Sequence, residues 1–278
     1  MIILKQSPNI LSCTVSTITP LQEIGRISRF AHGIEESQYL EEGMKILAGD
    51  VFSVSENITI DLEVEVSERL ARQINRHRHM AIVQKSTRYN DYIHQKDIVF
   101  YQPSDVPEKY WRDTIENHLQ NMGYSKTMKI GIESINYLLP LASMTKVHYH
   151  LNLRTLIHMF QVRSCTQALP EFQQLMYRIK DHLTGYGCEW DYIMMVYAHP
   201  QCVQVGIPFH YCKNPSLLCN NRFQLEKSSK PSHLLFQLEE RCEYYKNSLE
   251  ISQKWDQILK LHQKIFNPSI SKRIEGEI

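Results

Sequence analysis

The chain has 278 residues, of which 42% are hydrophobic and 22% charged, and its formal net charge is +1. This composition is typical of a globular protein with a sizeable core, and the small net charge argues against a protein that binds nucleic acid over its whole surface. No run of 18 apolar residues is present, which excludes a helical membrane span. The seven cysteines are irregularly spaced and no secretion signal is evident, so we expect reduced thiols and a cytoplasmic location.

The first elements are predicted from β-branched residues and helix-start signals. Residues 10–17 are expected to form a strand. Thr19 and Pro20 then predict the start of a helix, in which Thr19 caps the first turn and Gln22 reaches back to the cap. A short helix is expected over residues 37–47. The apolar face of the first helix is expected to comprise Leu21, Ile24, Ile27 and Ala31.

The clearest strand signal covers residues 59–66, where four aliphatic side chains alternate with polar ones. Ser67 is expected to cap the helix that follows. The inward positions of that helix are Leu70, Ala71 and Ile74. The helix leads into a basic stretch, Gln73–Tyr89, so a rigid strand and helix would position a loop suited to binding.

Three cations and an imidazole lie close together in this basic stretch. Arg76, His77 and Arg78 are consecutive, Ser86 comes after seven intervening residues, and Arg88 follows two positions later. Guanidinium groups keep their charge and offer a planar fork of donors, which suits phosphate groups. A solvated basic turn is the alternative interpretation of the same charges.

The middle of the chain is predicted to be mostly helical. Residues 90–110 are polar and contain two prolines, which indicates an exposed connection, and residues 111–122 predict a helix that ends at Gly123. A further helix is expected up to residue 139. His148 and His150 then alternate in a predicted strand. Two helical stripes follow, one made of Leu153, Leu156, Ile157 and Phe160, the other of Phe172, Leu175, Met176, Ile179 and Leu183.

The C-terminal third has a different character. Residues 191–199 are apolar and predict a strand, residues 200–232 are rich in loop signals, and residues 234–266 are expected to be mostly helical. The stripe of that last helix is Ile251, Trp255, Ile258, Leu261 and Ile265. A structural zinc site is one interpretation of His199, Cys202, His210, Cys212 and Cys219. Their spacing matches no strong zinc-finger pattern, which favours ordinary reduced cysteines and no metal.

Two blocks of sequence together resemble the flavin-dependent thymidylate synthase family. In the first, Arg76-His77-Arg78, seven residues and Ser86 match the signature Arg-His-Arg-x7-Ser, and Arg88-Tyr89 matches the Arg-Tyr that follows it. The second block is similar to the family's Leu-Pro-Leu, Asn-x-Arg-Ser-Leu and Leu-Arg-x4-Ala-x-x-Glu pattern. It consists of Leu139-Pro140-Leu141, Asn152-Leu153-Arg154-Thr155-Leu156, Arg163, Ala168 and Glu171. The resemblance covers residues 15–185.

This resemblance implies an α/β (α+β) fold, in which a mixed or antiparallel sheet packs with helices and a mostly helical C-terminal extension follows. It implies a catalytic domain over residues 1–187 and an extension over residues 188–278. Family members are homotetramers in which FAD and dUMP meet between subunits. The implied partners are therefore a deoxynucleotide monophosphate and further copies of the chain, with neither a membrane nor a stable nucleic-acid partner.

The implied reaction is the reductive methylation of dUMP to dTMP, in which methylenetetrahydrofolate gives the carbon and NADPH reduces the flavin. The resemblance assigns the FAD and folate side of the pocket to Arg76, His77, Arg78, His79, Asn152, Arg154 and His158. It assigns nucleotide binding to Gln73, Arg76, Gln84, Ser86, Thr87, Arg88 and Arg163.

Ser86 and Arg163 are the expected catalytic residues, and no metal and no cysteine nucleophile are implied. Ser86 would lie at the reacting edge of the uracil, and Arg88 would hold the phosphate. Arg163 would stabilise the enolate charge that develops on the pyrimidine oxygens, because preorganised cations lower the energy of such a transition state. A structural ion pair with Glu171 is the alternative role for Arg154 and Arg163.

Several positions depart from the family pattern. Of the family's His-x-x-Pro-Phe-Glu-His segment only Glu56 is kept, in a stretch that begins at Val51. The other departures are Val83-Gln84 for Asn-Glu, Thr87 for Gly, Asn136 for an arginine that grips the nucleotide phosphate, and His158 for Asn. The loss of a carboxylate at Gln84 leaves open a variant that acts on dCMP or makes a 5-hydroxymethyl product. A non-catalytic descendant that binds nucleotide or nucleic acid is the alternative from another class.

Overall fold

The computed structural model describes residues 1–49, 51–86, 97–127, 130–165, 167–200 and 249–266. The chain divides into two compact units, and each is described by itself. The first, the sheet unit, holds Met1–Thr14, Asp61–Leu151 and Leu169–Arg178. The second, the helical unit, holds Val15–Ile60, Asn152–Ala168 and the described residues from Ile179 onward. The expected boundary at residue 187 stays a prediction.

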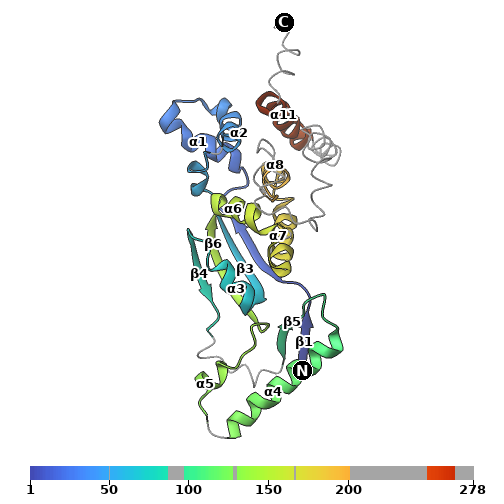
Figure 1. Cartoon of the computed structure of the whole chain (residues 1–278). Coiled ribbons are helices and arrows are strands. Elements are labelled where there is room, and N and C mark those ends of the chain that lie inside the picture. The colour runs from blue at the N-terminus through green and yellow to red at the C-terminus, as the bar shows by residue number, and fades with distance from the viewer. Residues whose placement is uncertain (50, 87–96, 128–129, 166, 201–248, 267–278) are drawn as a thin grey trace. The chain divides into compact units, whose positions relative to one another are not determined.

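The structure contains two sheets among the described residues. In the smaller sheet β1 (Ile2–Lys5) pairs in parallel with β5 (Ile98–Tyr101). In the larger sheet the strand order is β2 (Asn9–Val15), β3 (Thr59–Ser67), β6 (Met144–Asn152) and β4 (Met80–Gln84) (Figure 1). Strands β4 and β6 are antiparallel, and Gln84 lies opposite Val147. The predicted fold class, a mixed or antiparallel sheet packed with helices, is confirmed.

Strand β3 and helix α3 (Glu68–Ile74) agree with the sequence prediction. The aliphatic residues of β3 are buried, and so are Leu70, Ala71 and Ile74 of α3, which lies beside β3 and β6 (Figure 1). In β6 the residues Thr145, Val147, Tyr149 and Leu151 are buried, whereas the intervening histidines are partly exposed. His150 contacts Asp61 of β3 at 2.9 Å. One face of these strands is therefore buried against the core, and the other is exposed to solvent.

Two further helices complete the sheet unit beside the first part of α7 (Pro170–Leu183). They are α4 (Glu108–Thr127) and α5 (Ile132–Asn136). The sequence prediction ended the first of them at Gly123, but the helix continues through this glycine. Apart from the helix's own backbone, no described atom lies within 4 Å of where a Cβ would be at Gly123, so the residue makes no close contact there. Glycine lowers helix propensity without preventing the helix.

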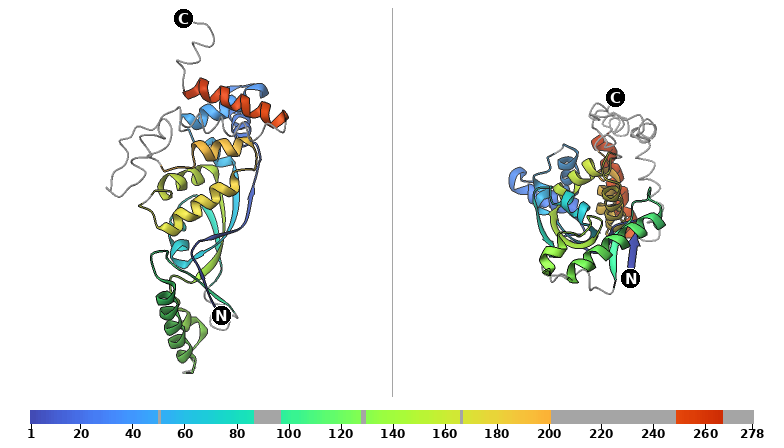
Figure 2. Two further views of the ribbon diagram at one scale, coloured as in Figure 1. Left: turned by 90° about the vertical axis from the view of Figure 1, so that its right-hand side faces the viewer. Right: turned by 60° about the horizontal axis from the view of Figure 1, so that its bottom comes forward.

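The helical unit contains the remaining helices. They are α1 (Pro20–His32), η1 (Glu36–Gln38), α2 (Tyr39–Ala48), η2 (Val54–Asn57), α6 (Leu153–Arg163), the end of α7, α8 (Cys188–Val196) and α11 (Leu249–Phe266). Helices α1 and α2 approach each other backbone to backbone at two glycines. A Cβ on Gly25 would lie 2.0 Å from the Tyr39 carbonyl oxygen, and one on Gly43 would lie 1.9 Å from the Leu21 carbonyl oxygen. Helix α11 lies beside α2 (Figure 2).

The predicted cap of α1 is wrong in its chemistry. The helix begins at Pro20 as expected, but the Thr19 side chain makes no capping hydrogen bond. Instead, the fully buried carboxylate of Glu189 accepts hydrogen bonds from the backbone N–H groups of Leu21 and Gln22 at 2.7 and 3.1 Å. The Lys254 ammonium lies 2.8 Å from the same carboxylate. An acceptor distant in sequence thus satisfies the helix start, and the charge of that acceptor is compensated.

Three other sequence predictions differ from the structure. Residues 98–101 form β5 within the segment predicted as an exposed connection. Residues 191–196 belong to helix α8, not to a strand, because that helix is buried on nearly every side and its sequence therefore shows no polar face. On α1, Ala31 is exposed. The two stripes of α6 and α7 are buried as predicted. The predictions for residues 201–248 lie outside the described residues.

Among the described residues, no helix combines the length and the apolar character that crossing a membrane requires.

The close approach of α1 and α2 leads to a stability prediction. Gly43→Ala should lower the free energy of unfolding by about 3 kcal/mol, because the added methyl group meets a backbone oxygen that cannot rotate away. Gly123→Ala is the matched control and should raise it by up to about 1 kcal/mol, since open space surrounds that helical glycine. Urea unfolding monitored by circular dichroism measures both. Equal effects of the two substitutions would contradict backbone contact at Gly43.

Candidate functional site

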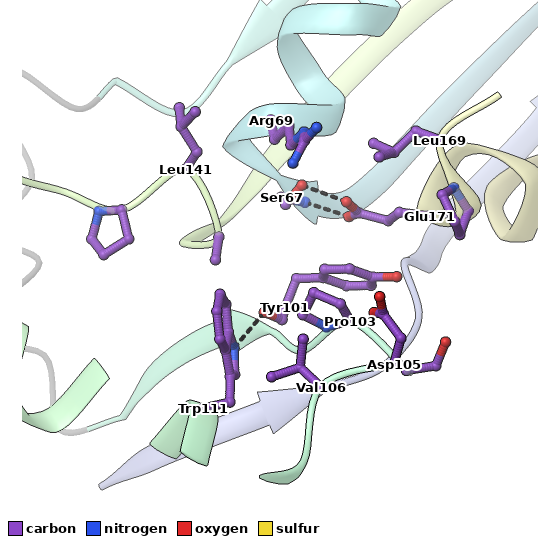
Figure 3. A pocket seen from close by; sticks show the side chains of 14 residues that line it. Ser67, Arg69, Tyr101, Pro103, Asp105, Val106, Trp111, Leu141, Leu169 and Glu171 are labelled. Atoms are coloured by element: carbon purple, nitrogen blue, oxygen red, sulfur yellow. Dashed lines mark hydrogen bonds between the residues drawn. The ribbon is translucent and has the colours of Figure 1, made fainter. Parts of the chain in front are cut away.

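A buried carboxylate anchors the start of α3, the helix that leads to the basic stretch. Glu171 is 1% exposed, and its two carboxylate oxygens accept from the backbone N–H of Ser67 at 2.8 Å and from the Ser67 hydroxyl at 2.5 Å (Figure 3). The same hydroxyl accepts from the backbone N–H of Leu70 at 3.0 Å, which confirms Ser67 as the helix cap. Burial raises the pKa of Glu171, whereas the Ser67 hydrogen bonds and the Arg69 charge act in the opposite direction.

The Leu-Pro-Leu segment of the second block is attached to the same helix start. The backbone N–H groups of Glu68 and Arg69 donate to the carbonyl oxygens of Ser143 and Leu141 at 2.9 and 3.0 Å. The first amides of a helix have no partner inside the helix. Here they are satisfied by the Ser67 side chain and by this neighbouring turn, so residues of the second block hold the start of the helix whose other end leads to the first block.

The Arg-His-Arg segment forms a turn between α3 and β4. Arg76 and Arg78 are exposed, and the half-buried His77 places its ring edge-on to Phe172, with 5.9 Å between ring centroids. His79 has a φ of 65°, the left-handed region that few residues other than glycine adopt. Backbone strain of this kind persists only where the surroundings impose it, and it is frequent at binding sites. Exposed guanidinium groups on a tightly constrained turn suit an anionic ligand.

Beside this turn, hydrogen bonds join Gln84, a predicted site residue, to Glu68 and Asn75, which were not predicted. The Gln84 Nε2 atom donates to the Glu68 Oε2 atom at 2.9 Å, and the Asn75 Nδ2 atom donates to the Gln84 Oε1 atom at 3.4 Å. Ser86 is exposed just beyond β4. Gln73 is half-buried at the end of α3. Thr87 and Arg88 lie outside the described residues, so the structure gives no account of them.

A small pocket of about 280 Å³ adjoins this chain of hydrogen bonds. Its described lining includes two carboxylates and a single guanidinium, which makes it a poor phosphate site as it stands. The lining residues are Glu68, Arg72, Glu133, Asn136, Tyr137, Leu139 and Leu141. Asn136, which stands where the family has a phosphate-binding arginine, is therefore in a mainly acidic setting.

A larger pocket of about 660 Å³ lies on another side of the start of α3 (Figure 3). It is lined by Ser67, Arg69, Glu171 and several apolar side chains, and Tyr101 and Trp111 supply aromatic rings. Burial, and then the nearby charge of Glu171, raises the pKa of Tyr101 to about 12. None of the predicted site residues lines this pocket. The pocket has no signal in the sequence, because β5, which carries Tyr101, lies in a segment whose polar residues and prolines predict a loop.

The second block starts α6 in the helical unit. Asn152 caps this helix, because its Oδ1 atom accepts from the backbone N–H of Thr155 at 2.8 Å. Arg154 forms an ion pair with Glu56, the residue kept from the family's His-x-x-Pro-Phe-Glu-His segment. His158 is exposed one turn after Arg154, and Arg163 is the half-buried last residue of α6. The pair joins two family segments that are about 100 positions apart in sequence.

The alternative role for Arg154 and Arg163 was a structural ion pair with Glu171. Arg154 does form an ion pair, but its partner is Glu56, whereas the Glu171 carboxylate accepts hydrogen bonds from Ser67. Both members of the Arg154 pair are about half exposed, so the pair contributes little to stability. An exposed arginine held by a carboxylate remains able to contact a ligand.

Of the five zinc candidates only His199 lies in the described part of the chain. Its Nε2 atom lies 2.7 Å from the Met195 carbonyl oxygen, and burial, together with the charge of Lys180, lowers its pKa to about 4. Within the described residues no group of three or more His, Cys, Asp or Glu side chains is arranged to hold a metal ion.

The family model described as "Thymidylate synthase complementing protein" matches residues 22–185. The chain is 28% identical over 176 residues to the flavin-dependent thymidylate synthase of Thermococcus onnurineus, a match that covers 60% of this chain and 69% of that protein. It is 24% identical over 227 residues to the enzyme of the same name from Nitratidesulfovibrio vulgaris, covering 77% of this chain and 86% of that protein.

Solved structures of similar fold include two that were determined with a bound nucleotide. Thymidylate synthase X from Helicobacter pylori, solved with FAD and dUMP, has a TM-score of 0.51 at 19% identity and covers 65% of this chain and 94% of that chain. The UMP/dUMP methylase PolB from Streptomyces cacaoi, solved with 5-Br dUMP, has a TM-score of 0.55 at 13% identity and covers 71% and 99%. At these identities the likeness concerns the fold alone.

The anchoring carboxylate leads to a pH-dependent prediction. Glu171→Gln should lower the free energy of unfolding by about 1–3 kcal/mol, because the amide nitrogen faces one of the two Ser67 donors where a carboxylate oxygen accepted before. The raised pKa means that the folded chain binds this proton more tightly than the unfolded chain. The resulting stability is complete below the ordinary pKa of 4.5 and is lost as the pH rises through the raised pKa.

The variant has no carboxyl group that titrates at this position. The loss of free energy of unfolding caused by Glu171→Gln should therefore be larger at pH 5 than at pH 8. Urea unfolding at both pH values measures it, with Glu108→Gln as the control at an exposed carboxylate of α4. A cost that grows with pH would contradict the assignment.

Proposed function

The chain belongs to the flavin-dependent thymidylate synthase family, whose model matches more than half of its length, and from this membership we propose that it methylates dUMP to dTMP. It is thus an enzyme that transfers one-carbon groups to C5 of a pyrimidine nucleotide. In the proposed reaction methylenetetrahydrofolate gives the carbon and NADPH the reducing equivalents. The observation that carries the proposal is the exposed turn with Arg76 and Arg78 on it, followed at the signature distance by Ser86.

The residues of the turn fit the diphosphate of FAD. Two exposed guanidinium groups offer permanent charge and forked donors to its phosphate oxygens. The left-handed backbone at His79 turns the chain sharply between them and β4. In the second block Arg154, oriented by Glu56, and the exposed His158 supply further polar groups. Bound FAD would supply the electron chemistry, whereas the protein supplies position and electrostatic field.

The proposed tasks of the nucleotide-binding residues follow from their chemistry. Gln73, Gln84 and Ser86 would orient the pyrimidine, with Ser86 at the reacting edge, and Thr87 and Arg88 would hold sugar and phosphate. Arg163, which ends α6, would stabilise negative charge on the pyrimidine oxygens as the C5 position reacts. We also propose the homotetramer of the family, in which active sites are shared between subunits.

Two alternatives rest on the departures. Because Gln84 stands where the family has a carboxylate, a dCMP substrate or a 5-hydroxymethyl product is the alternative within the same class. Because Asn136 replaces a phosphate-binding arginine in an acidic pocket, a non-catalytic nucleotide-binding descendant is the alternative outside it. The retained Arg76, Arg78 and Arg163 favour the enzyme.

Flavin content and label release test the proposal. The purified protein should show flavin absorbance and release FAD on denaturation. With NADPH and methylenetetrahydrofolate it should release tritium from C5-labelled dUMP, with little release from C5-labelled dCMP. Release from dCMP alone would establish the other substrate, and a colourless protein without release would support the non-catalytic descendant.

Arg163→Ala should lower the rate of tritium release at least 100-fold, because the charge that develops on the pyrimidine oxygens loses its cation. Flavin content and the midpoint of thermal unfolding should stay unchanged. Arg26→Ala, which removes a half-exposed arginine of α1 paired with Glu23, is the matched control and should keep full activity. Wild-type turnover in Arg163→Ala would remove this residue from the mechanism.

A further inference from the structure

Glu68 is a buried carboxylate that sequence analysis did not assign to the site. It is the first residue of α3 and is 9% exposed. Its Oε2 atom accepts from Gln84, and its Oε1 atom has no hydrogen-bond partner among the described residues. Burial raises the pKa of Glu68, although Gln84, Thr145 and the Arg72 charge favour the ionised form. Burying a carboxylate is costly, so a structural explanation alone is a weak one for this residue.

The contact with Glu68 determines the orientation of the Gln84 side chain. An ionised carboxylate can only accept hydrogen bonds, so the amide nitrogen of Gln84 must face it. The opposite atom, Oε1, then faces Asn75 and accepts from the Nδ2 atom of that residue. The two ends of this carboxamide are therefore distinguished by chemistry, since a flipped amide would place an oxygen against the carboxylate.

We propose that Glu68 is a positioning residue, which fixes the Gln84 carboxamide in one orientation and thereby sets which pyrimidine the site accepts. This inference rests on the proposed function, because it needs Gln84 to contact the nucleotide base. Glu68 itself acts through Gln84 and is not assigned to the reacting atoms.

The edges of uracil and cytosine explain why a fixed amide discriminates. Uracil presents an acceptor at O4 and a donor at N3, whereas cytosine presents a donor at N4 and an acceptor at N3, the reverse order. A carboxamide that is free to flip can match either edge, and a fixed one can match only one of them. Leaving one polar group without its partner costs about tenfold in affinity.

The same contact explains how the chain tolerates glutamine where the family has glutamate. A glutamate at position 84 would place a second carboxylate against Glu68 at the present 2.9 Å contact. Like charges so close cannot both ionise readily. In this chain the pair consists of one carboxylate, on α3, and one amide, on β4.

The first test measures binding of dUMP and dCMP by calorimetry to the flavin-loaded protein. The wild type should prefer dUMP at least tenfold, and Glu68→Gln should bring the two affinities within about threefold, because a glutamine there lets either amide orientation form. Glu63→Gln, which removes an exposed carboxylate of β3, is the matched control and should keep the preference. An unchanged preference in Glu68→Gln would overturn the proposal.

The second test exchanges the two side chains. Gln84→Glu alone should weaken dUMP binding at least tenfold, and adding Glu68→Gln should restore it, because the double variant contains one carboxylate and one amide again. No restoration would overturn the pairing.

A readout without ligand separates this inference from the proposed function. If the wild type binds neither nucleotide, the proposed function fails, and the role in base selection fails with it. The thermal midpoints of Glu68→Gln, Gln84→Glu and the double variant still test the pair: a double variant more stable than Gln84→Glu supports it, and additive losses overturn it.

Discussion

The site depends on the contact between Glu171 and Ser67 inside the sheet unit. Ser67 ends β3 and caps α3, so the direction in which α3 leaves the sheet is set at one residue. Glu171 fixes that residue through both carboxylate oxygens, and the turn at Leu141 supplies a further acceptor to the next amides. At its other end α3 leads directly to the turn with Arg76 and Arg78. The direction of the exposed cations thus follows from a hydrogen-bond network buried at the opposite end of a short helix.

Sequence reasoning succeeded where the signal is local. The alternation in β3, the cap at Ser67 and the stripes of α6 and α7 each depend on residues within a few positions of one another, and each is present in the structure. It failed where a partner comes from far away. The acceptor for the start of α1 is Glu189, and no pattern near Thr19 indicates it. Helix α8 was predicted as a strand because a helix buried all round shows no period.

The candidate site shows the same division. The signature residues and their spacing identified the turn, but Glu68 carries no motif and became visible only through its contact with Gln84. Departures that look like losses in the sequence have a physical setting in the fold. Gln84 lies against a carboxylate, and Asn136 lies in a pocket whose described lining is mainly acidic. In the sequence, Gln84 suggests the loss of a carboxylate, whereas in the structure the carboxylate of Glu68 lies next to it.

The Glu189 contact also bears on how the chain acquires its fold. Glu189 and the Leu21 amide are separated by 168 positions, so this contact closes a loop that contains the whole of the matched family region. Contacts of such long range form late and slow folding, because the chain loses much entropy before they form. During synthesis the first turn of α1 leaves the ribosome long before Glu189 does. The segment beyond the family region therefore completes the folding of the first helix within it.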